Sequence, residues 1–463
     1  MADALEEVYA SLAKRFKGEI LRPGNVEFEQ GHRIWNAAVQ RRPALIARCN
    51  DVADVIVAVK SAAAADLVTA IRCGGHSLAG FSSCGDGLVI DLCRMRGVRV
   101  DEENRRARIE GGCLLGTIDA QTQRSGLAFP AGVVSHTGAA GLILGGGTGW
   151  LTRLHGLSCD NVERFTLVAA DGSIVRASSG ENEDLYWALR GGGGNFGVVV
   201  EFELRLHPLT AVLIANACYG LDRMFDVLRY WREFMLDAPD ELKWNLSLRL
   251  GPVSSSVPQA LRGRPMLSQT LLWLGKEAQG RKVLEQIRSR INSDSAKVEA
   301  LSFLSLQTMA DHEFPHGRRY YTKSGYFKVL SDETIETMIA ALESIPSPDT
   351  QIELAYLGGA ASKIRAEDTA FGDRSSPFIL NLLAAWDTPA HDQANKEWVR
   401  NLFSAVRPAM SPGVYVNFMS GDEENRVVEA YRGRWERLLS VKNHYDPTNY
   451  FRLNHNIRGQ QQS

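Results

Sequence analysis

The sequence predicts an α+β protein, because short helical and strand patterns alternate and two of the strand pairs are joined as hairpins. Between residues 50 and 67 apolar side chains recur at helical spacing behind an Asn-Asp capping signal. A short apolar strand follows at Leu67–Ile71. Polar residues 101–106 then separate the strands Val98–Val100 and Ala107–Glu110, as in a β-hairpin. Helix, buried strand and hairpin within one hundred residues are typical of an α+β fold.

The next hundred residues repeat this mixture and end at Pro208. The patterns predict a helix at Leu115–Arg124, a hairpin of Arg164–Ala169 and Ile174–Ala177, a helix at Glu183–Arg190 and a strand at Val198–His207. Beyond Pro208 the segments lengthen and hold much of the Trp, Tyr and Phe content. We therefore expect one domain at 1–208, with lobes at about 1–102 and 103–208, a second at 209–418, and a C-terminal segment at 419–463 that includes a helix at Glu423–Val441.

Composition excludes several classes of protein. Of the 463 residues, 52 are basic and 54 acidic, so no charge excess favours binding to nucleic acid or to an anionic membrane. The sequence shows no signal peptide and no apolar run long enough to span a bilayer, so we expect a cytoplasmic protein. Seven scattered cysteines indicate neither a disulfide framework nor a zinc site. His312 and His316, with Asp311 and Glu313, have no matching ligand set elsewhere, so no metal is predicted.

Three glycine clusters suggest a dinucleotide cofactor. They lie at 74–75, 138–149 and 191–197. Glycine lets backbone N–H groups surround a diphosphate, because it adopts positive φ and has no Cβ. None of the clusters has the strand, G-x-G-x-x-G and helix arrangement of a Rossmann fold. The alternative is that these glycines only form tight turns.

Five motifs make a family resemblance specific. Residues 72–77 (RCGGHS), 138–149 (GAAGLILGGGTG), 156–162 (GLSCDNV), 194–197 (GNFG) and 445–449 (YDPTN) resemble, in order and spacing, the berberine-bridge-enzyme-like branch of the vanillyl-alcohol oxidase superfamily. The resemblance runs over nearly the whole chain. It implies a PCMH-type FAD-binding domain of two α+β lobes and a substrate domain with an antiparallel β-sheet flanked by helices. It also implies that the C-terminal segment returns to the FAD domain.

The same resemblance implies FAD held by two covalent bonds. One would join His76 to the 8α-methyl group, and the other would join Cys159 to C6 of the flavin. Val162 falls where the family controls access of oxygen, and a small branched residue there favours an oxidase. The residues expected at the cofactor are Arg72, Gly74, Gly75, His76, Ser77, Gly132, Thr137, Gly138, Gly141, Gly145, Gly146, Cys159, Asp160, Val162, Gly197, Asn454 and Asn456.

The catalytic base cannot be copied from the family. The segment Tyr415-Val-Asn-Phe418 matches a strand whose last residue is often a tyrosine that acts as the base, and here that residue is Phe418. Tyr415, Asn417 or a residue from elsewhere in the chain is left as the proton acceptor or orienting group, and Tyr431 is a further catalytic candidate whose role is open. If 415–418 is a strand, only one of Tyr415 and Val416 faces the flavin.

The resemblance thus predicts an FAD-linked oxidase whose partners are a small-molecule substrate and dioxygen. It would take a hydride from a hydroxyl- or amine-bearing carbon of a sugar or a bulky natural product and release hydrogen peroxide. An oxidative cyclase or a dehydrogenase of the same family would share every motif. A flavin-binding protein without catalytic activity is the remote alternative, which the loss of the usual tyrosine at Phe418 keeps open.

Overall fold

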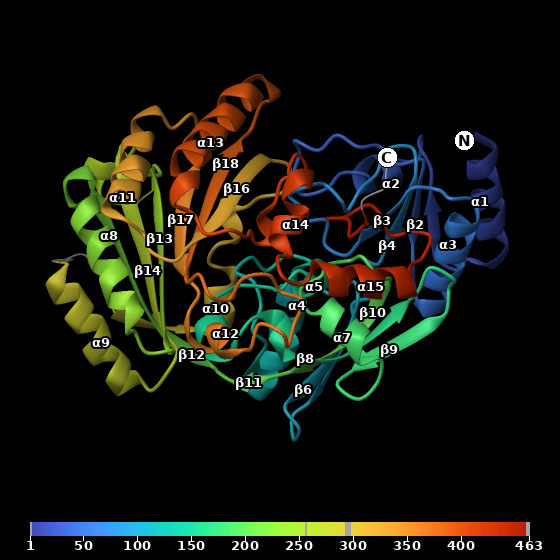
Figure 1. Ribbon diagram of the computed structural model, residues 1–463, viewed down its shortest axis with the longest axis horizontal. Helices are drawn as coiled ribbons and strands as arrows, with labels where there is room; N and C mark the ends of the chain where they lie inside the picture. The colour runs from blue at the N-terminus through green and yellow to red at the C-terminus, as the bar shows by residue number, and fades with distance from the viewer. Residues whose placement is uncertain (1, 255–256, 292–297, 460–463) are drawn as a thin grey trace.

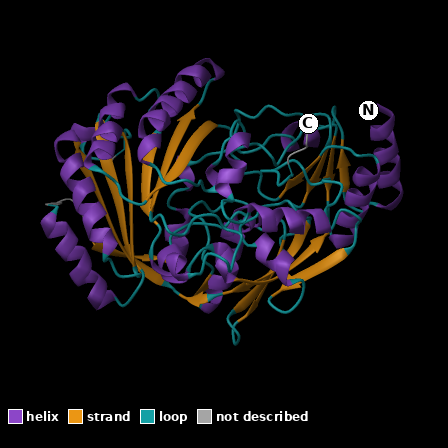
Figure 2. Ribbon diagram, viewed as in Figure 1, coloured by secondary structure: helices purple, strands orange, loops and turns teal. Residues whose placement is uncertain are grey.

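The computed structural model describes residues 2–254, 257–291 and 298–459. Two halves lie side by side (Figure 1). One half is built on a seven-stranded sheet with helices on its outer face, and the other on two smaller sheets with shorter helices around them (Figure 2). The α+β prediction is confirmed.

The first small sheet has the strand order β1-β2-β4-β3. Strands β2, β4 and β3 are parallel, and β1 pairs with β2 in the antiparallel sense. The side chains of β4 are buried on both faces, as in a parallel sheet covered on two sides. The elements of this unit are α1 (Ala2–Arg15), β1 (Glu19–Leu21), α2 (Val26–Gly31), β2 (Leu45–Arg48), α3 (Val52–Ala64), β3 (Thr69–Arg72) and β4 (Leu88–Asp91).

The second small sheet has the order β5-β6-β10-β8-β9 and is entirely antiparallel. The predicted hairpins and helices of this region are present. Its elements are β5 (Val98–Asp101), β6 (Arg106–Glu110), α4 (Leu115–Thr122), η1 (Gln123–Ser125), α5 (Ala139–Leu144), α6 (Thr152–His155), η2 (Ser158–Asn161), β8 (Val162–Val168), β9 (Ile174–Ser178), α7 (Glu183–Leu189) and β10 (Val198–Arg205). A two-stranded ladder of β7 (Leu127–Ala128) and β11 (His207–Pro208) follows at its edge.

The seven-stranded sheet is antiparallel, in the order β15-β12-β14-β13-β17-β18-β16. Its strands are β12 (Ala211–Gly220), β13 (Leu242–Leu250), β14 (Pro265–Trp273), β15 (Val298–Ser302), β16 (Arg319–Phe327), β17 (Gln351–Tyr356) and β18 (Phe378–Trp386). Apolar side chains of one face pack against α8 (Leu221–Leu236), α9 (Glu277–Arg290), α11 (Asp332–Ala340) and α13 (Asp392–Val406). The opposite face is turned toward the rest of the molecule (Figure 1). The remaining short helices are η3 (Gln259–Leu261), α10 (Phe303–Thr308), η4 (Asp311–Glu313), η5 (Ala341–Ser344), α12 (Gly359–Lys363), η6 (Pro389–His391) and η7 (Arg407–Ala409).

Two expectations for the C-terminal region are wrong. The helix expected at Glu423–Val441 is divided into η9 (Glu424–Arg426), α14 (Val427–Ala430) and α15 (Trp435–Tyr445), because Gly433 adopts a φ of 73° in the turn between them. Residues 415–418 do not form a strand. They form a 3-10 turn, η8 (Val416–Phe418), in which the Phe418 N–H donates to the Tyr415 carbonyl instead of to a neighbouring strand.

The end of the chain lies against both small sheets. The Tyr450 hydroxyl donates to Thr69 Oγ1 at 2.8 Å, and the Ile457 N–H donates to Asn195 Oδ1 at 3.1 Å. Among the described residues, none of the helices is long and apolar enough to cross a membrane.

Candidate functional site

A cavity of about 850 Å³ lies between the glycine turns and the inner face of the seven-stranded sheet. Its size is in the range of cofactor and ligand sites. One wall comes from turns of residues 73–79 and 132–149 and from residues 193–197, and the opposite wall comes from β13, β14, β17 and β18. The cavity therefore joins the two halves of the molecule.

The glycine turns that contain Gly74 and Gly138 contact each other in the first of these walls. A Cβ on Gly74 would lie 2.4 Å from the Gly138 nitrogen, and one on Gly138 would lie 2.3 Å from the Gly74 nitrogen. No side chain fits at either position, so the two turns can meet only as glycines. This arrangement presents bare backbone to the cavity, as a bound diphosphate requires.

His76 projects from the first turn and is held on two sides. Its Nε2 lies 2.9 Å from His136 Nδ1, and its ring stacks on Trp35 with centroids 4.3 Å apart. Burial lowers the pKa of His76 well below its usual value, and the neighbouring imidazoles of His136 and His316 lower it further. His76 is therefore neutral near pH 7, and its Nδ1 is the nitrogen not engaged by His136.

Most of the residues predicted at the site do line this cavity. They are Gly74, Gly75, His76, Ser77, Gly132, Thr137, Gly138, Gly141, Gly197 and Asn454 for the cofactor, and Tyr415, Asn417 and Tyr431 for catalysis. Because η8 is helical, both Tyr415 and Val416 face the cavity, contrary to the strand interpretation.

Cys159 lies next to the cavity wall, because Leu357, Ile379 and Tyr415 of its apolar cluster line the cavity. It is fully buried and packs in an apolar cluster with Leu157, Phe371 and Tyr415, and it is not among the described residues that line the cavity. Burial is the largest cause that raises the pKa of its thiol, followed by the charge of Asp160. The bond expected from its sulfur to flavin C6 stays a prediction.

The two neighbours of Cys159 that were predicted at the flavin have structural contacts instead. Asp160 forms a buried ion pair with Arg374, with Oδ1 and Nη2 2.6 Å apart, and accepts a hydrogen bond from the Leu157 N–H. Val162 begins β8 and is part of the core beneath the second sheet. Neither residue is among the described residues that line the cavity, and control of oxygen access by Val162 stays a prediction.

Four other predicted cofactor residues also lie outside the cavity wall. Arg72 pairs with buried Asp91 at 2.6 Å. A Cβ on Gly145 would lie 2.1 Å from Asn417 Oδ1, and one on Gly146 would lie 2.6 Å from the Phe371 ring, so both glycines allow close packing of η8 and its neighbours. Asn456 lies beyond the cavity lining, in the segment that contacts Asn195.

The sequence interpretation missed the polar wall opposite the glycine turns. Residues that alternate along β13 project from this face, together with their neighbours on β17 and β18: Lys243, Asn245, Ser247, Arg249, Gln351, Glu353 and Asn381. The intervening residues Trp244 and Leu248 of β13 are in the apolar core. Strict alternation in LKWNLSLRL was the available signal, since it predicts a strand with one polar face.

Glu353 stands out on this wall. It lies opposite Asn381 in the ladder and accepts a hydrogen bond from Asn381 Nδ2 at 2.6 Å. Its side chain is half-buried and lines the cavity, and burial is the largest cause that raises its pKa to about 7. A carboxyl with that pKa exchanges a proton readily near neutral pH.

Tyr415 has a different protonation state. Its hydroxyl accepts hydrogen bonds from the Gly147 N–H at 2.9 Å and from Asn417 Nδ2 at 2.8 Å. Burial is the largest cause that raises its pKa to about 12, so the phenol stays protonated at neutral pH. Tyr431 donates to the Gly192 carbonyl at 3.2 Å, and burial raises its pKa as well. Neither phenol is therefore a ready proton acceptor.

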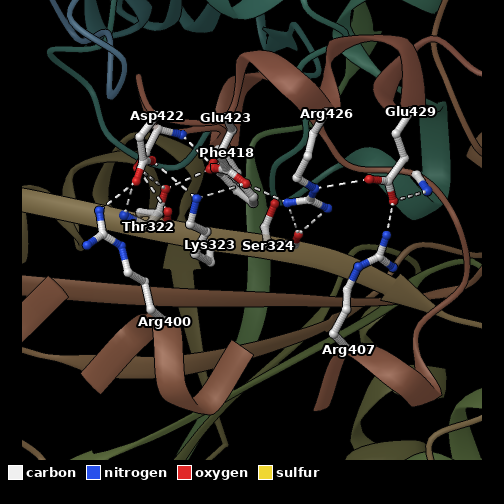
Figure 3. Close-up of polar contacts among 12 residues, drawn as sticks. Thr322, Lys323, Ser324, Arg400, Arg407, Phe418, Asp422, Glu423, Arg426 and Glu429 are labelled. Atoms are coloured by element: carbon white, nitrogen blue, oxygen red, sulfur yellow. Dashed lines mark hydrogen bonds and ion pairs between the residues drawn. The ribbon is translucent and has the colours of Figure 1, made fainter. Parts of the chain in front are cut away.

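A network of ion pairs holds η8 against β16 (Figure 3). Thr322 Oγ1 donates to the Phe418 carbonyl at 2.6 Å. Glu423, with a side chain 1% exposed, accepts from Arg426 Nη1 at 2.6 Å and from the Ser420 N–H at 2.9 Å, and it lies 3.4 Å from Lys323 Nζ. These contacts fix the turn whose side chains enter the cavity.

Three imidazoles gather beside the cavity. One nitrogen each from His76, His136 and His316 lies within 4.8 Å of the others, close enough to be considered as a metal site. The expectation of no metal came from the surroundings of His316 in the sequence, which do not reveal His76 and His136 as its neighbours in space. Two of these nitrogens, on His76 and His136, already bond each other at 2.9 Å, which argues for an orienting contact.

Two family models match the chain. One described as an FAD binding domain matches residues 43–178, and one described as berberine and berberine like matches residues 414–458. The first range includes both glycine turns and His76, and the second includes η8 and the segment after α15. This chain is an FAD-dependent oxidoreductase that carries an FAD binding domain and a berberine-like domain.

Its relatives span nearly the full chain. An FAD-linked oxidoreductase of Dictyostelium discoideum is 29% identical over 98% of this chain and 97% of its own. The (R)-6-hydroxynicotine oxidase of Paenarthrobacter nicotinovorans is 28% identical over 95% and 96%. The crystal structure of 6-hydroxy-D-nicotine oxidase from Arthrobacter nicotinovorans superposes with a TM-score of 0.84 at 27% identity, covering 96% of this chain and 98% of that one. Glucooligosaccharide oxidase from Acremonium strictum, at 24% identity, shares the fold with a TM-score of 0.85, covering 97% of this chain and 98% of that one.

Proposed function

We propose that this protein is an oxidase that binds FAD in the cavity through one covalent bond, at His76. It would oxidise a carbon that bears a hydroxyl or amine group and reduce dioxygen to hydrogen peroxide. The observation that supports this most is the placement of His76, which lies between two turns of bare backbone and a polar wall within a single cavity. The nicotine oxidase among its relatives fits an oxidase.

A single bond fits the geometry better than two. The FAD of the glucooligosaccharide oxidase is described as 6-S-cysteinyl and 8α-N1-histidyl. In this chain His76 Nδ1 is left free by the contact of Nε2 with His136, whereas the Cys159 thiol is fully buried in a cluster with Tyr415 and Phe371, and this burial raises its pKa. We therefore propose attachment through His76 Nδ1 alone, and the acid-denaturation experiment below tests the second bond expected from the sequence, at Cys159.

Glu353 is the proton acceptor in this proposal. When bound, FAD supplies the hydride acceptor that dioxygen reoxidises. Glu353 takes the substrate proton on the carboxyl oxygen that Asn381 does not hold, and its pKa of about 7 makes it an effective base near neutral pH. Tyr415 accepts two hydrogen bonds and can therefore direct its own proton into the cavity, where it orients a substrate oxygen or nitrogen.

The attachment is tested by acid denaturation. Wild-type protein precipitated in acid should retain its yellow colour, His76→Ala should release it, and Cys159→Ala should retain it. Mass spectrometry of proteolytic peptides should locate the flavin on the peptide that contains His76. Covalent flavin in His76→Ala would show a second attachment and contradict the single bond that we propose.

His136 should act as a positioning residue for this bond. Its Nδ1 is the hydrogen-bond partner of His76 Nε2, so His136→Ala leaves the imidazole free to rotate. We expect a lower ratio of covalent to releasable flavin in His136→Ala, measured by absorbance before and after acid precipitation. His136→Gln, which can still hydrogen-bond His76, should recover part of the ratio. An unchanged ratio in His136→Ala would exclude this role.

The reaction is tested with alcohols, sugars and amines as substrates. For an oxidase, peroxide formed should equal oxygen consumed. Anaerobic reduction by a substrate followed by slow reoxidation in air would indicate a dehydrogenase instead. A bound flavin that no substrate reduces would favour a protein without catalytic activity.

A further inference from the structure

Lys243 differs from the other buried lysines. The side chains of Lys323 and Lys442 are held by carboxylates, at 3.2 Å from Asp422 and 2.6 Å from Asp446 respectively. Lys243 is 4% exposed and lines the cavity, yet no hydrogen bond or ion pair joins its ammonium group to any residue within 2–254, 257–291 and 298–459. A buried cation without a partner is costly, so its presence in a cavity wall calls for an explanation.

Near Lys243 lie a second positive charge and a second hydrogen-bond donor without an acceptor in the described part of the chain. Burial first, and then the charge of nearby Arg153, lower the pKa of Lys243 to about 7. Arg153 itself is bound by backbone carbonyls, including that of Leu242 at 2.7 Å. Trp150 also lines the cavity, and its indole N–H is buried without an acceptor among the described atoms. Trp150 packs in one cluster with Leu272, the residue directly opposite Lys243.

We propose that Lys243 binds a carboxylate group of the substrate, with the Trp150 N–H as a second donor. Both groups donate, both lie at the Leu272 end of the cavity wall, and an anion is the ligand that an unpaired ammonium favours. The substrate class is therefore an acid that also bears the hydroxyl or amine to be oxidised. This inference rests on the proposed function, because bound flavin serves as the reporter in its first test.

The first test compares two probes that differ in charge. Benzoate and benzamide are titrated into the purified holoenzyme while the flavin absorbance is followed. We expect benzoate to bind about tenfold or more tightly than benzamide in the wild type, which is the value of one charge-assisted hydrogen bond. Lys243→Met should remove this preference, and Lys243→Arg should retain part of it. Equal affinities in the wild type, or an unchanged preference in Lys243→Met, would overturn the proposal.

The second test separates binding from structure. If Lys243 has no internal partner, Lys243→Met should unfold at a higher temperature than the wild type in the absence of ligand. Lys323→Met is the matched control: it removes a buried lysine that is paired with Asp422 and Glu423, and it should unfold at a lower temperature. A Lys243→Met variant destabilised like the control would show an internal partner and overturn the proposal. Covalent flavin is measured in every variant, so failure of the attachment is distinguished from failure of the anion site.

Discussion

Glu353→Gln is expected to slow reduction of the bound flavin by substrate by about 10²- to 10⁴-fold, the usual contribution of a general base. Glutamine has the same shape and can still accept the hydrogen bond from Asn381, so the change removes the proton acceptor and little else. Stopped-flow absorbance under anaerobic conditions measures this step alone. Reoxidation of the reduced variant by dioxygen should proceed at the wild-type rate.

Glu313→Gln is the matched control for that experiment. Glu313 also lines the cavity, but its carboxylate forms an ion pair with Arg249 at 2.6 Å. Its replacement should change flavin reduction far less. If both variants reduce at the same rate as the wild type, the base lies elsewhere.

The rate of flavin reduction and the stability of the fold should depend on pH in opposite directions. Only the ionised form of Glu353 accepts a proton, so the reduction rate should rise as pH increases through about 7 and then level off. Stability should move in the opposite direction. Folded Glu353 keeps its proton above pH 4.5 while the unfolded chain loses it, so stability falls with rising pH until about 7. Glu353→Gln should remove the dependence of the rate and reduce that of stability, because buried Asp119, whose pKa is also raised to about 7, still contributes to the latter.

The part of the site built from local sequence could be predicted. The turn at Gly74–His76 and the glycines that meet it are specified by short motifs, because only glycine fits where two backbones touch. Local motifs do not determine the direction of the Cys159 side chain. A motif places its backbone correctly, but whether the sulfur faces the cavity or the cluster around Phe371 depends on residues more than two hundred positions away.

The polar wall is a second case in which local sequence was insufficient. Glu353 lies in QIELAY, where one charged residue in a short apolar run is compatible with a solvent-facing strand. Lys243 lies in a strand whose alternation predicts a polar face but not what that face meets. Their role follows only when β13, β17 and β18 are placed opposite the glycine turns. The short helix η8 was missed for a related reason, since its conformation depends on contacts with β16.

Glu423→Ala is expected to destabilise the protein by about 3–5 kcal/mol, because it leaves two buried cations without their shared carboxylate. Lys323 and Arg426 both reach Glu423 Oε1, and the Ser420 N–H loses its acceptor as well (Figure 3). Urea denaturation followed by tryptophan fluorescence measures the change. Asp422→Ala is the control: Asp422 also pairs with Lys323, but its side chain is 39% exposed, and water screens such pairs, so its loss should cost about 1 kcal/mol or less.

Glu423→Ala should also affect the active site. Ser420 and Phe418 are tied to Thr322 of β16, and Asn417 in the same turn holds the Tyr415 hydroxyl. Freed from Glu423, this turn should move Tyr415 away from the position in which it orients substrate. We therefore expect Glu423→Ala to raise KM and lower the rate of flavin reduction, while covalent flavin at His76, which is held by Trp35 and His136 instead, remains at the wild-type level. Equal loss of stability in the Glu423 and Asp422 variants would mean that burial of Glu423 is not what holds the turn.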